Sequence, residues 1–278
     1  MDTRPVGVFD SGLGGLTAVR QLTACMPEER IVYFGDTGRV PYGSRSRGTI
    51  RRYARQDAAF LLSQDVKMIV AACGTVSSVA ADLGRELPVP FLGVLGPTAQ
   101  AAAAATRTGR IGVIGTTATI RSGSYRRALA AIDPAFQVFD RDCPLFVPLV
   151  ENGFFAPDDP IPRLTAERYL APLREANVDT LILGCTHYPL LLPVVAQVMG
   201  PDVALIDSGR ETALACRRFL QEHGLEAPAG QEGGRRFFVS DRTEGFASIA
   251  QILLGESLEG SVEHIDIENF PCAGAEDR

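Results

Sequence analysis

The sequence predicts an α/β fold of two similar domains, each a mostly parallel sheet flanked by helices, that face each other across a cleft. Short aliphatic runs alternate with amphipathic stretches, which is the pattern of βα units in a parallel sheet. Two of these runs end in a cysteine on a small-residue turn, at Cys73 and at Cys185. The cysteines are separated by roughly the length of one small α/β domain.

The expected strands are apolar runs bounded by polar residues or glycine. In chain order they cover residues 5–9, 31–34, 68–72, 91–95, 110–115, 136–139, 180–184, 203–206 and 237–240. Helical spacing of apolar residues predicts helices that include 16–26, 50–62 and 165–175. Right-handed crossovers bring the carboxyl ends of the strands in a sheet to one edge, which is where ligands of such sheets collect.

A weak internal repeat supports two related domains. VFDSG at Asp10 resembles LIDSG at Asp207, and VAACGT at Cys73 resembles LGCTH at Cys185. The repeat favours a pseudo-two-fold relation between the domains, with the site in the cleft between them.

We expect the chain to cross between domains near residues 96 and 208. Residues 1–96 and 208–270 then form a discontinuous first domain, and residues 97–207 form the second. The tail, residues 271–278, has no periodicity and is expected to be disordered.

The composition is that of a soluble globular protein. The 278 residues are 46% hydrophobic and 22% charged, and the net charge of −6 provides no general basic field for nucleic acid. The arginines of residues 45–55 follow a helical pattern and are interpreted as a solvated helix face, with an anion or nucleic-acid patch as the alternative. Neither a signal peptide nor an apolar run of the ~20 residues needed for a membrane span is visible. A cytoplasmic location is therefore expected.

Residue counts argue against cofactors. Lys67 is the only lysine and opens the strand that ends at Cys73, so it lies at the wrong edge of the sheet for a pyridoxal phosphate Schiff base. It also lacks the preceding glycine-rich run of a P-loop. The six cysteines include no CxxC pair, and Cys185 with His187 has no second ligand pair at zinc spacing. We therefore expect free thiols, no metal and no organic cofactor.

Loops after two strands carry groups suited to anion binding. The segment from Asp10 to Gly15 opens a helix, but Thr17 stands where the dinucleotide fingerprint needs a third glycine. An N-cap formed by Asp10 or Ser11 is the alternative interpretation. The loop of residues 35–43 contains a Pro-Tyr-Gly turn that could present backbone amides to a carboxylate. Thiols at two strand ends could face one ligand from opposite sides, which suits moving a proton from one face of a carbon to the other.

Together these segments resemble glutamate racemases. VFDSGLGGLTAV, GDTGRVPYG, the Cys73 turn, GTTATIRSGSY, CPLFVPLVENG and LGCTHYPLL occur in the order and spacing of that family, from about residue 5 to about residue 267. The resemblance implies a cofactor-independent isomerase that interconverts L- and D-glutamate. It further implies a role in peptidoglycan biosynthesis, and hence in cell wall biogenesis and cell shape, and a homodimer.

The same resemblance implies roles for individual residues. Cys73 and Cys185 match the two acid/base thiols, with Cys73 acting on the D-enantiomer and Cys185 on the L-enantiomer. Asp10, Glu151 and His187 resemble residues that tune the cysteines or carry their protons. The positions that match substrate contacts are Asp10, Ser11, Tyr42, Gly43, Gly74, Thr75, Thr116, Thr119, Thr186 and His187.

Gly74 departs from the family pattern, which usually has asparagine directly after the first cysteine. The departure removes hydrogen-bonding groups, and one such bond to a charged group contributes about 1.5–3 kcal/mol. Two alternatives follow from it: a racemase of aspartate or another acidic amino acid, and a racemase-like binding protein with impaired catalysis.

Overall fold

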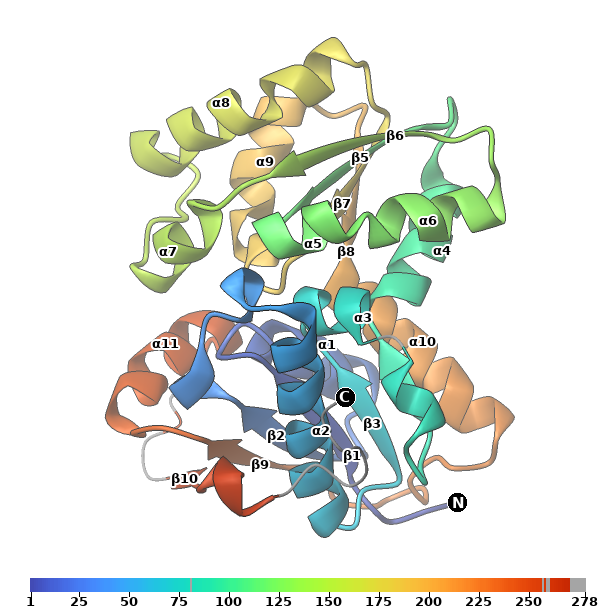
Figure 1. Ribbon diagram of the computed structural model, residues 1–278, viewed down its shortest axis with the longest axis vertical. Coiled ribbons are helices and arrows are strands. Elements are labelled where there is room, and N and C mark those ends of the chain that lie inside the picture. The colour runs from blue at the N-terminus through green and yellow to red at the C-terminus, as the bar shows by residue number, and fades with distance from the viewer. Residues whose placement is uncertain (81, 257, 259–260, 271–278) are drawn as a thin grey trace.

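Two parallel sheets, each flanked by helices, form the two halves of the molecule (Figure 1). The computed structural model describes residues 1–80, 82–256, 258 and 261–270, so the predicted disordered tail at 271–278 lies outside the described residues. The first sheet has the strand order β10-β9-β2-β1-β3-β4 and the second has the order β6-β5-β7-β8. All pairings are parallel. The predicted α/β fold class is confirmed.

The strands coincide closely with the predicted apolar runs. Their bounds are β1 (Val6–Asp10), β2 (Arg30–Gly35), β3 (Met68–Ala71), β4 (Phe91–Gly93), β5 (Arg110–Gly115), β6 (Gln137–Asp142), β7 (Thr180–Leu183), β8 (Ala204–Asp207), β9 (Gly234–Val239) and β10 (Val262–His264). Strand β10 was not among the predicted strands. This three-residue edge strand is largely exposed and therefore has no apolar run to reveal it.

The helices within the described residues are α1 (Leu16–Cys25), α2 (Arg47–Ser63), α3 (Gly74–Val79), α4 (Leu95–Ala105), α5 (Thr117–Ser122), α6 (Ser124–Ile132), α7 (Phe146–Glu151), α8 (Pro160–Glu175), α9 (Leu192–Met199), α10 (Ser208–Glu222) and α11 (Glu244–Leu254). Helix α8 begins five residues before the predicted start at 165. The carboxylate of Asp159 caps it by accepting from the Ile161 amide, and Pro160 occupies its first turn, a position that tolerates the missing N–H.

The two sheets share a strand order, β2-β1-β3-β4 in one and β6-β5-β7-β8 in the other. Cys73 follows β3 and Cys185 follows β7, so the cysteines occupy equivalent positions. The resemblance between Asp10 and Asp207 is not such an equivalence, and that part of the sequence interpretation is wrong. Asp10 ends β1, whose counterpart is β5, whereas Asp207 ends β8 and caps α10 through the amides of residues 209 and 210.

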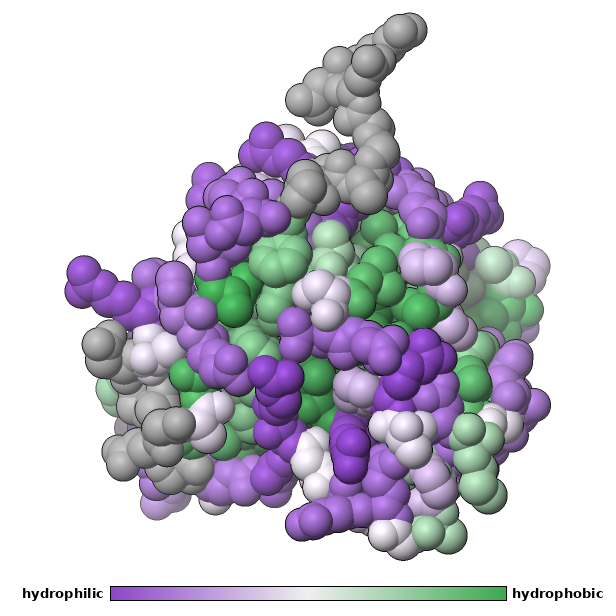
Figure 2. All heavy atoms as spheres, turned by 90° about the horizontal axis from the view of Figure 1, so that it is seen from below, coloured by the Kyte–Doolittle hydropathy of each residue, from purple (hydrophilic) through white to green (hydrophobic). Residues whose placement is uncertain are grey.

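Strands β9 and β10 extend the first sheet beside β2, although they follow the second sheet in the sequence. We propose on this basis that residues 208–270 belong with residues 1–96 in the first domain. Viewed from the end that holds the six-stranded sheet, areas of apolar surface (green) lie among polar and charged side chains (purple) (Figure 2). No helix in the described part of the chain combines the length and apolar character that a membrane crossing requires.

Lys67 lies just before β3, at the opposite end of that strand from Cys73. Its ammonium is buried, forms an ion pair with Glu29 at 2.6 Å, and donates to the backbone carbonyls of Asp2 and Leu225. The chain's single lysine therefore ties the N-terminal segment and the loop after α10 to the first sheet.

The arginine-rich helix α2 turns its apolar side to the core and its charged side outward, as predicted. Arg51 pairs with Asp82, and Arg55 pairs with Glu86. At these two positions the arginines of the helix face are therefore paired with surface carboxylates.

Candidate active site

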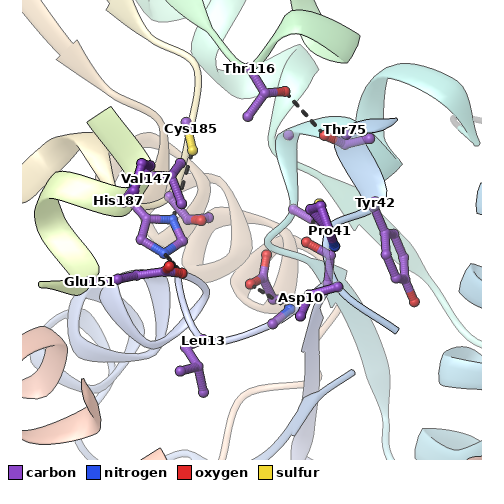
Figure 3. Close-up of a pocket in the computed structure, with 18 of the residues that line it drawn as sticks. Asp10, Leu13, Pro41, Tyr42, Thr75, Thr116, Val147, Glu151, Cys185 and His187 are labelled. Carbon is purple, nitrogen blue, oxygen red and sulfur yellow. Dashed lines mark hydrogen bonds and ion pairs between the residues drawn. The ribbon is translucent and has the colours of Figure 1, made fainter. Parts of the chain in front are cut away.

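A cavity of about 980 Å³ opens between the carboxyl ends of the two sheets (Figure 3). Each of the sequence-predicted site residues lines it: Asp10, Ser11, Tyr42, Gly43, Cys73, Gly74, Thr75, Thr116, Thr119, Glu151, Cys185, Thr186 and His187. Asp10 ends β1, Thr116 follows β5, and the cysteines follow β3 and β7. The structure thus brings together residues that lie far apart in the sequence, because the parallel strands of each sheet end at the edge that borders the cavity.

Cys73 lies in a buried environment that favours the neutral thiol. Its Sγ donates to the hydroxyl of Ser11 at 3.3 Å. Burial and the negative charge of Asp10 raise the pKa of Cys73 to about 12, although the contact with Ser11 opposes this shift. Without a ligand, Cys73 is therefore a proton donor at neutral pH.

Asp10 is itself buried beneath the loop that it begins. Its carboxylate accepts from the Gly12 amide at 3.2 Å. Burial raises the pKa of Asp10, while the charge of His187 and the amides of the following turn oppose the rise. The charge of Asp10 is coupled to the protonation of Cys73, whose pKa it raises.

Cys185 has a different proton environment. Its Sγ lies 3.9 Å from Nδ1 of His187, and Nε2 of the same ring lies 3.1 Å from Oε1 of Glu151. Burial by itself lowers the pKa of His187, but the contacts with Cys185 and Glu151 outweigh it and raise the pKa to about 10. An imidazolium therefore lies between a sulfur and a carboxylate, and it supplies the positive charge that a thiolate at Cys185 needs.

The loops that carry the two cysteines touch each other. A Cβ atom added at Gly74 would lie 2.6 Å from the carbonyl oxygen of Gly184, which is closer than any stable contact. Gly74 and Gly184 adjoin Cys73 and Cys185 in the sequence, so their contact holds the two thiol loops together. The Thr17 hydroxyl, from α1, separately holds the Cys185 loop by donating to the Thr186 carbonyl at 2.7 Å.

Gly14 is required at its position because a Cβ there would overlap the side chains of Thr186 and His187. The Gly-Gly turn of the first loop therefore serves close packing against the Cys185 loop. The N-cap alternative considered for Asp10 and Ser11 does not hold for α1, since neither side chain caps that helix.

The hydroxyl groups of Thr75, Thr116 and Thr119 form one wall of the cavity, the hydroxyl wall. Oγ1 of Thr116 lies 3.4 Å from Oγ1 of Thr75 and 3.0 Å from Oγ1 of Thr119. Thr116 also caps α5, since its oxygen accepts from the Thr119 amide at 3.3 Å. This wall can donate several hydrogen bonds to an anionic ligand.

Tyr42 lines the cavity but directs its hydroxyl group away from it, as Figure 3 shows. The phenol hydrogen-bonds with the buried carboxyl groups of Asp36 and Asp57. Any contact of residues 42–43 with a ligand would therefore come from their backbone rather than from the phenol.

Several lining residues were not among those predicted from the sequence. Arg121, Asp241 and Arg242 lie at the exposed rim, and apolar side chains such as Leu13 and Phe246 form another part of the wall. Asp241 and Arg242 follow β9, so the same strand-end argument that found the cysteines could have found them. No such signal exists for Leu13 or Phe246, which resemble ordinary core residues.

The described residues contain neither a disulfide nor a clustered set of metal ligands. The cysteines at 25, 73, 143, 185 and 216 are free thiols. No group of three or more His, Cys, Asp or Glu side chains within this part of the chain is arranged to hold a metal ion.

The fold and the site define the structural class: a parallel α/β protein with two sheets and a pair of thiols in one cavity. Residues 17–216 match the family model described as Asp/Glu/Hydantoin racemase. Glutamate racemases of Geobacter metallireducens and Syntrophus aciditrophicus are 46% and 47% identical to the chain, with 96% of this chain and 98% of each relative covered. A solved glutamate racemase of Francisella tularensis in complex with D-glutamate superimposes with a TM-score of 0.89 at 36% identity, covering 97% of this chain and 100% of that one.

The chain therefore belongs to the Asp/Glu/Hydantoin racemase family, and it is a racemase of the isomerase class.

Proposed function

We propose that the protein interconverts L- and D-glutamate by proton transfer between the two thiols without a cofactor. The observation that carries this proposal is the placement of Cys73 and Cys185. They follow equivalent strands, line one cavity and have different proton environments. Glutamate is the proposed substrate because the relatives that cover nearly the whole chain are glutamate racemases.

In the direction from L- to D-glutamate, the Cys185 thiolate removes the proton from Cα, and the electron pair of that C–H bond remains on carbon. The thiol of Cys73 then donates its proton to the opposite face, so its sulfur becomes the thiolate. One proton is taken up and one is delivered, which leaves the total number of protons unchanged. The reverse reaction begins with Cys73 as the base and Cys185 as the acid.

The neighbours of each thiol fit these exchanges of charge. His187, held by Glu151, stabilises a thiolate at Cys185 while that residue is the base. Before Cys73 acts as the base, its thiol must lose a proton, and Asp10 is the proposed acceptor of that proton, which also removes the negative charge that otherwise raises the pKa of Cys73. Asp10 and His187 are thus proposed to keep the thiols in opposite protonation states.

The hydroxyl wall supplies the proposed binding groups for the two carboxylates of glutamate. Thr75, Thr116 and Thr119 are near enough to share one carboxylate. Backbone amides of the loops after β1, β2 and β7 provide further donors at the cavity surface. Holding both carboxylates fixes Cα between the thiols. This positioning of the reacting groups raises the reaction rate.

Deuterium exchange tests the proposal. Purified, reduced protein in D₂O should incorporate deuterium at Cα of glutamate from either enantiomer and produce the other enantiomer. Aspartate under identical conditions tests the competing substrate. Faster turnover of aspartate would refute the substrate assignment, and no exchange with either amino acid would refute the proposed reaction.

We further propose that the product D-glutamate enters peptidoglycan biosynthesis and so supports cell wall biogenesis and cell shape. This role rests on the family relationship and is tested by removing the gene, which should make growth depend on added D-glutamate. A cytoplasmic location is proposed because the described cysteines are free thiols, as in a reducing compartment.

A homodimer is the proposed assembly. Exposed apolar side chains at Leu145, Phe154, Ile161 and Leu164, around α7 and the start of α8, provide a candidate contact surface. Light scattering coupled to size-exclusion chromatography should give twice the mass of one chain. Replacing Leu164 with glutamate should lower the measured mass to that of one chain. A monomeric mass for the unmodified protein would exclude the dimer.

A further inference from the structure

A buried polar cluster lies behind the cavity wall that residues 36–43 form. It consists of Asp36, Arg39 and Tyr42 from this segment and Asp57 from α2. The carboxyl groups of Asp36 and Asp57 are fully buried, and only Tyr42 of the four reaches the cavity. Asp36, Arg39 and Asp57 are therefore too far back to touch a ligand, yet they support the segment that does.

The hydrogen bonds of Tyr42 require one more proton than two ionised carboxylates and a phenol contain. The phenol oxygen bonds to Oδ2 of Asp36 and lies 3.0 Å from Oδ2 of Asp57. A phenol has one proton to donate, and an ionised carboxylate can only accept. One of the two contacts must therefore use a proton that belongs to a carboxyl group.

Charge leads to the same requirement. Arg39 is the cation shared by the two carboxyl groups, through Nε to Asp36 at 2.7 Å and Nη2 to Asp57 at 3.0 Å. Two carboxylates with one guanidinium would leave a net negative charge in the interior, where it is costly. A single proton neutralises the cluster.

The partners of each carboxyl group indicate where this proton lies. Asp36 accepts from Arg39 at 2.7 Å, from the Ser240 hydroxyl at 2.7 Å and from Tyr42, which suits an anion. Within the described part of the chain, the partners of the Asp57 carboxyl group are the Tyr42 phenol and the Arg39 guanidinium. We infer that Asp57 is a neutral carboxylic acid that donates to Tyr42, so that a chain from Asp57 through Tyr42 to Asp36 holds residues 36–43 in the cavity wall.

The surroundings of Asp57 support this assignment. Burial and the charge of Asp36 raise the pKa of Asp57 well above its usual range, Asp10 adds to the rise, and Arg39 and Tyr42 oppose it. A further charged group on this cluster is Glu268 from the segment after β10, which lies 3.5 Å from Arg39. Its carboxylate is largely exposed and so affects Asp57 less than the buried Asp36 does.

Asp57 is accordingly a positioning residue. The segment that it holds contributes Thr37, Val40, Pro41, Tyr42 and Gly43 to the cavity. Gly43 faces the hydroxyl wall, because a Cβ there would lie 3.8 Å from Thr116. The effect on turnover rests on the proposed function, whereas the protonation of Asp57 can be measured without turnover.

The Asp57→Asn and Asp36→Asn variants form a matched pair. Asparagine at 57 keeps a neutral group that can donate to Tyr42 and accept from Arg39. Asparagine at 36 removes the anion on which three donors converge. We expect Asp57→Asn to keep KM for glutamate within about threefold, and Asp36→Asn to raise it by about tenfold or more. Equal effects of the two substitutions on KM would overturn the assigned position of the proton.

Stability as a function of pH measures the proton directly. An unfolded chain releases the Asp57 proton near its ordinary pKa of about 3.9, whereas the folded protein retains it, so wild-type stability falls as the pH rises above that value. The Asp57→Asn variant lacks this proton. The ratio of the wild-type to the variant unfolding constant should therefore rise about tenfold per pH unit from pH 5 until the folded protein releases the proton.

Infrared spectra give an independent readout. The wild-type protein at pH 7 should show a carbonyl stretch of a buried carboxylic acid that is missing from the spectrum of Asp57→Asn. Loss of that band with a pH-dependent unfolding ratio supports the inference even if glutamate is not turned over, in which case only the proposed function fails. Identical infrared spectra and a constant unfolding ratio would overturn the inference regardless of activity.

Discussion

Replacement of Gly74 by alanine tests how closely the two thiol loops must approach. The added Cβ would lie 2.6 Å from the Gly184 carbonyl oxygen, and ordinary contacts begin near 3.4 Å, so the loops must separate by about 0.8 Å. Both partners are backbone, and neither can rotate out of the way. A displacement near 1 Å in a reacting geometry can cost about a hundredfold in rate, so kcat should fall by about ten- to a hundredfold.

Asparagine at position 74 adds a sharper test. Its amide supplies hydrogen-bonding groups that glycine lacks, but its Cβ meets the same carbonyl oxygen. We therefore expect Gly74→Asn to lower kcat/KM in this protein, measured by circular dichroism of glutamate turnover from each enantiomer. Gly48→Ala is the control, because a Cβ at Gly48 meets no atom within 4 Å. Undiminished activity in both Gly74 variants would refute the proposed spacing.

Three further predictions concern charge. Because His187 has a pKa raised to about 10, turnover of L-glutamate should decline as the pH rises through that value, and Glu151→Gln should move the decline to lower pH. Lys67→Met should lower the free energy of unfolding in urea by about 3–5 kcal/mol, because it leaves the Glu29 carboxylate buried without its cation. Arg242→Gln should lower kcat/KM several-fold at low salt, with kcat unchanged, because an exposed charge at the cavity rim attracts the anionic substrate.

Each of these predictions has a contrasting outcome. If turnover of L-glutamate by Glu151→Gln declined at the same high pH as in the wild type, Glu151 would have no effect on the protonation of His187. The double variant of Lys67→Met with Glu29→Leu should recover much of the lost stability, and its failure to do so would contradict the unpaired-charge explanation. Arg217→Gln, on the outer face of α10, is the control for Arg242→Gln. A loss for Arg242→Gln that persists at high salt would exclude long-range attraction.

The fold could be predicted from the sequence because buried strands of a parallel sheet are continuous apolar runs. The strand that was not predicted, β10, is an exposed edge strand that contains a glutamate and a histidine. The start of α8 was missed because apolar spacing sets in only after its proline-containing first turn. Apolar periodicity thus detects burial, and it fails where a regular element is solvated.

The site could be predicted wherever a strand end delivers a side chain directly to the cavity. Cys73, Cys185 and Asp10 belong to this group. The direction of the Tyr42 hydroxyl could not be predicted, because it depends on Asp57, which comes from a helix whose packing the sequence does not reveal. The contact of Gly74 with Gly184 likewise depends on how the two halves of the molecule meet.

Single-thiol variants in D₂O measure most directly whether two sulfurs divide the reaction. With Cys73→Ala, L-glutamate should gain deuterium through Cys185 without forming the D-enantiomer. With Cys185→Ala, D-glutamate should gain it through Cys73 without forming the L-enantiomer. Racemisation at the wild-type rate by either variant, or exchange of both enantiomers by one of them, would contradict the assignment of one thiol to each face of Cα.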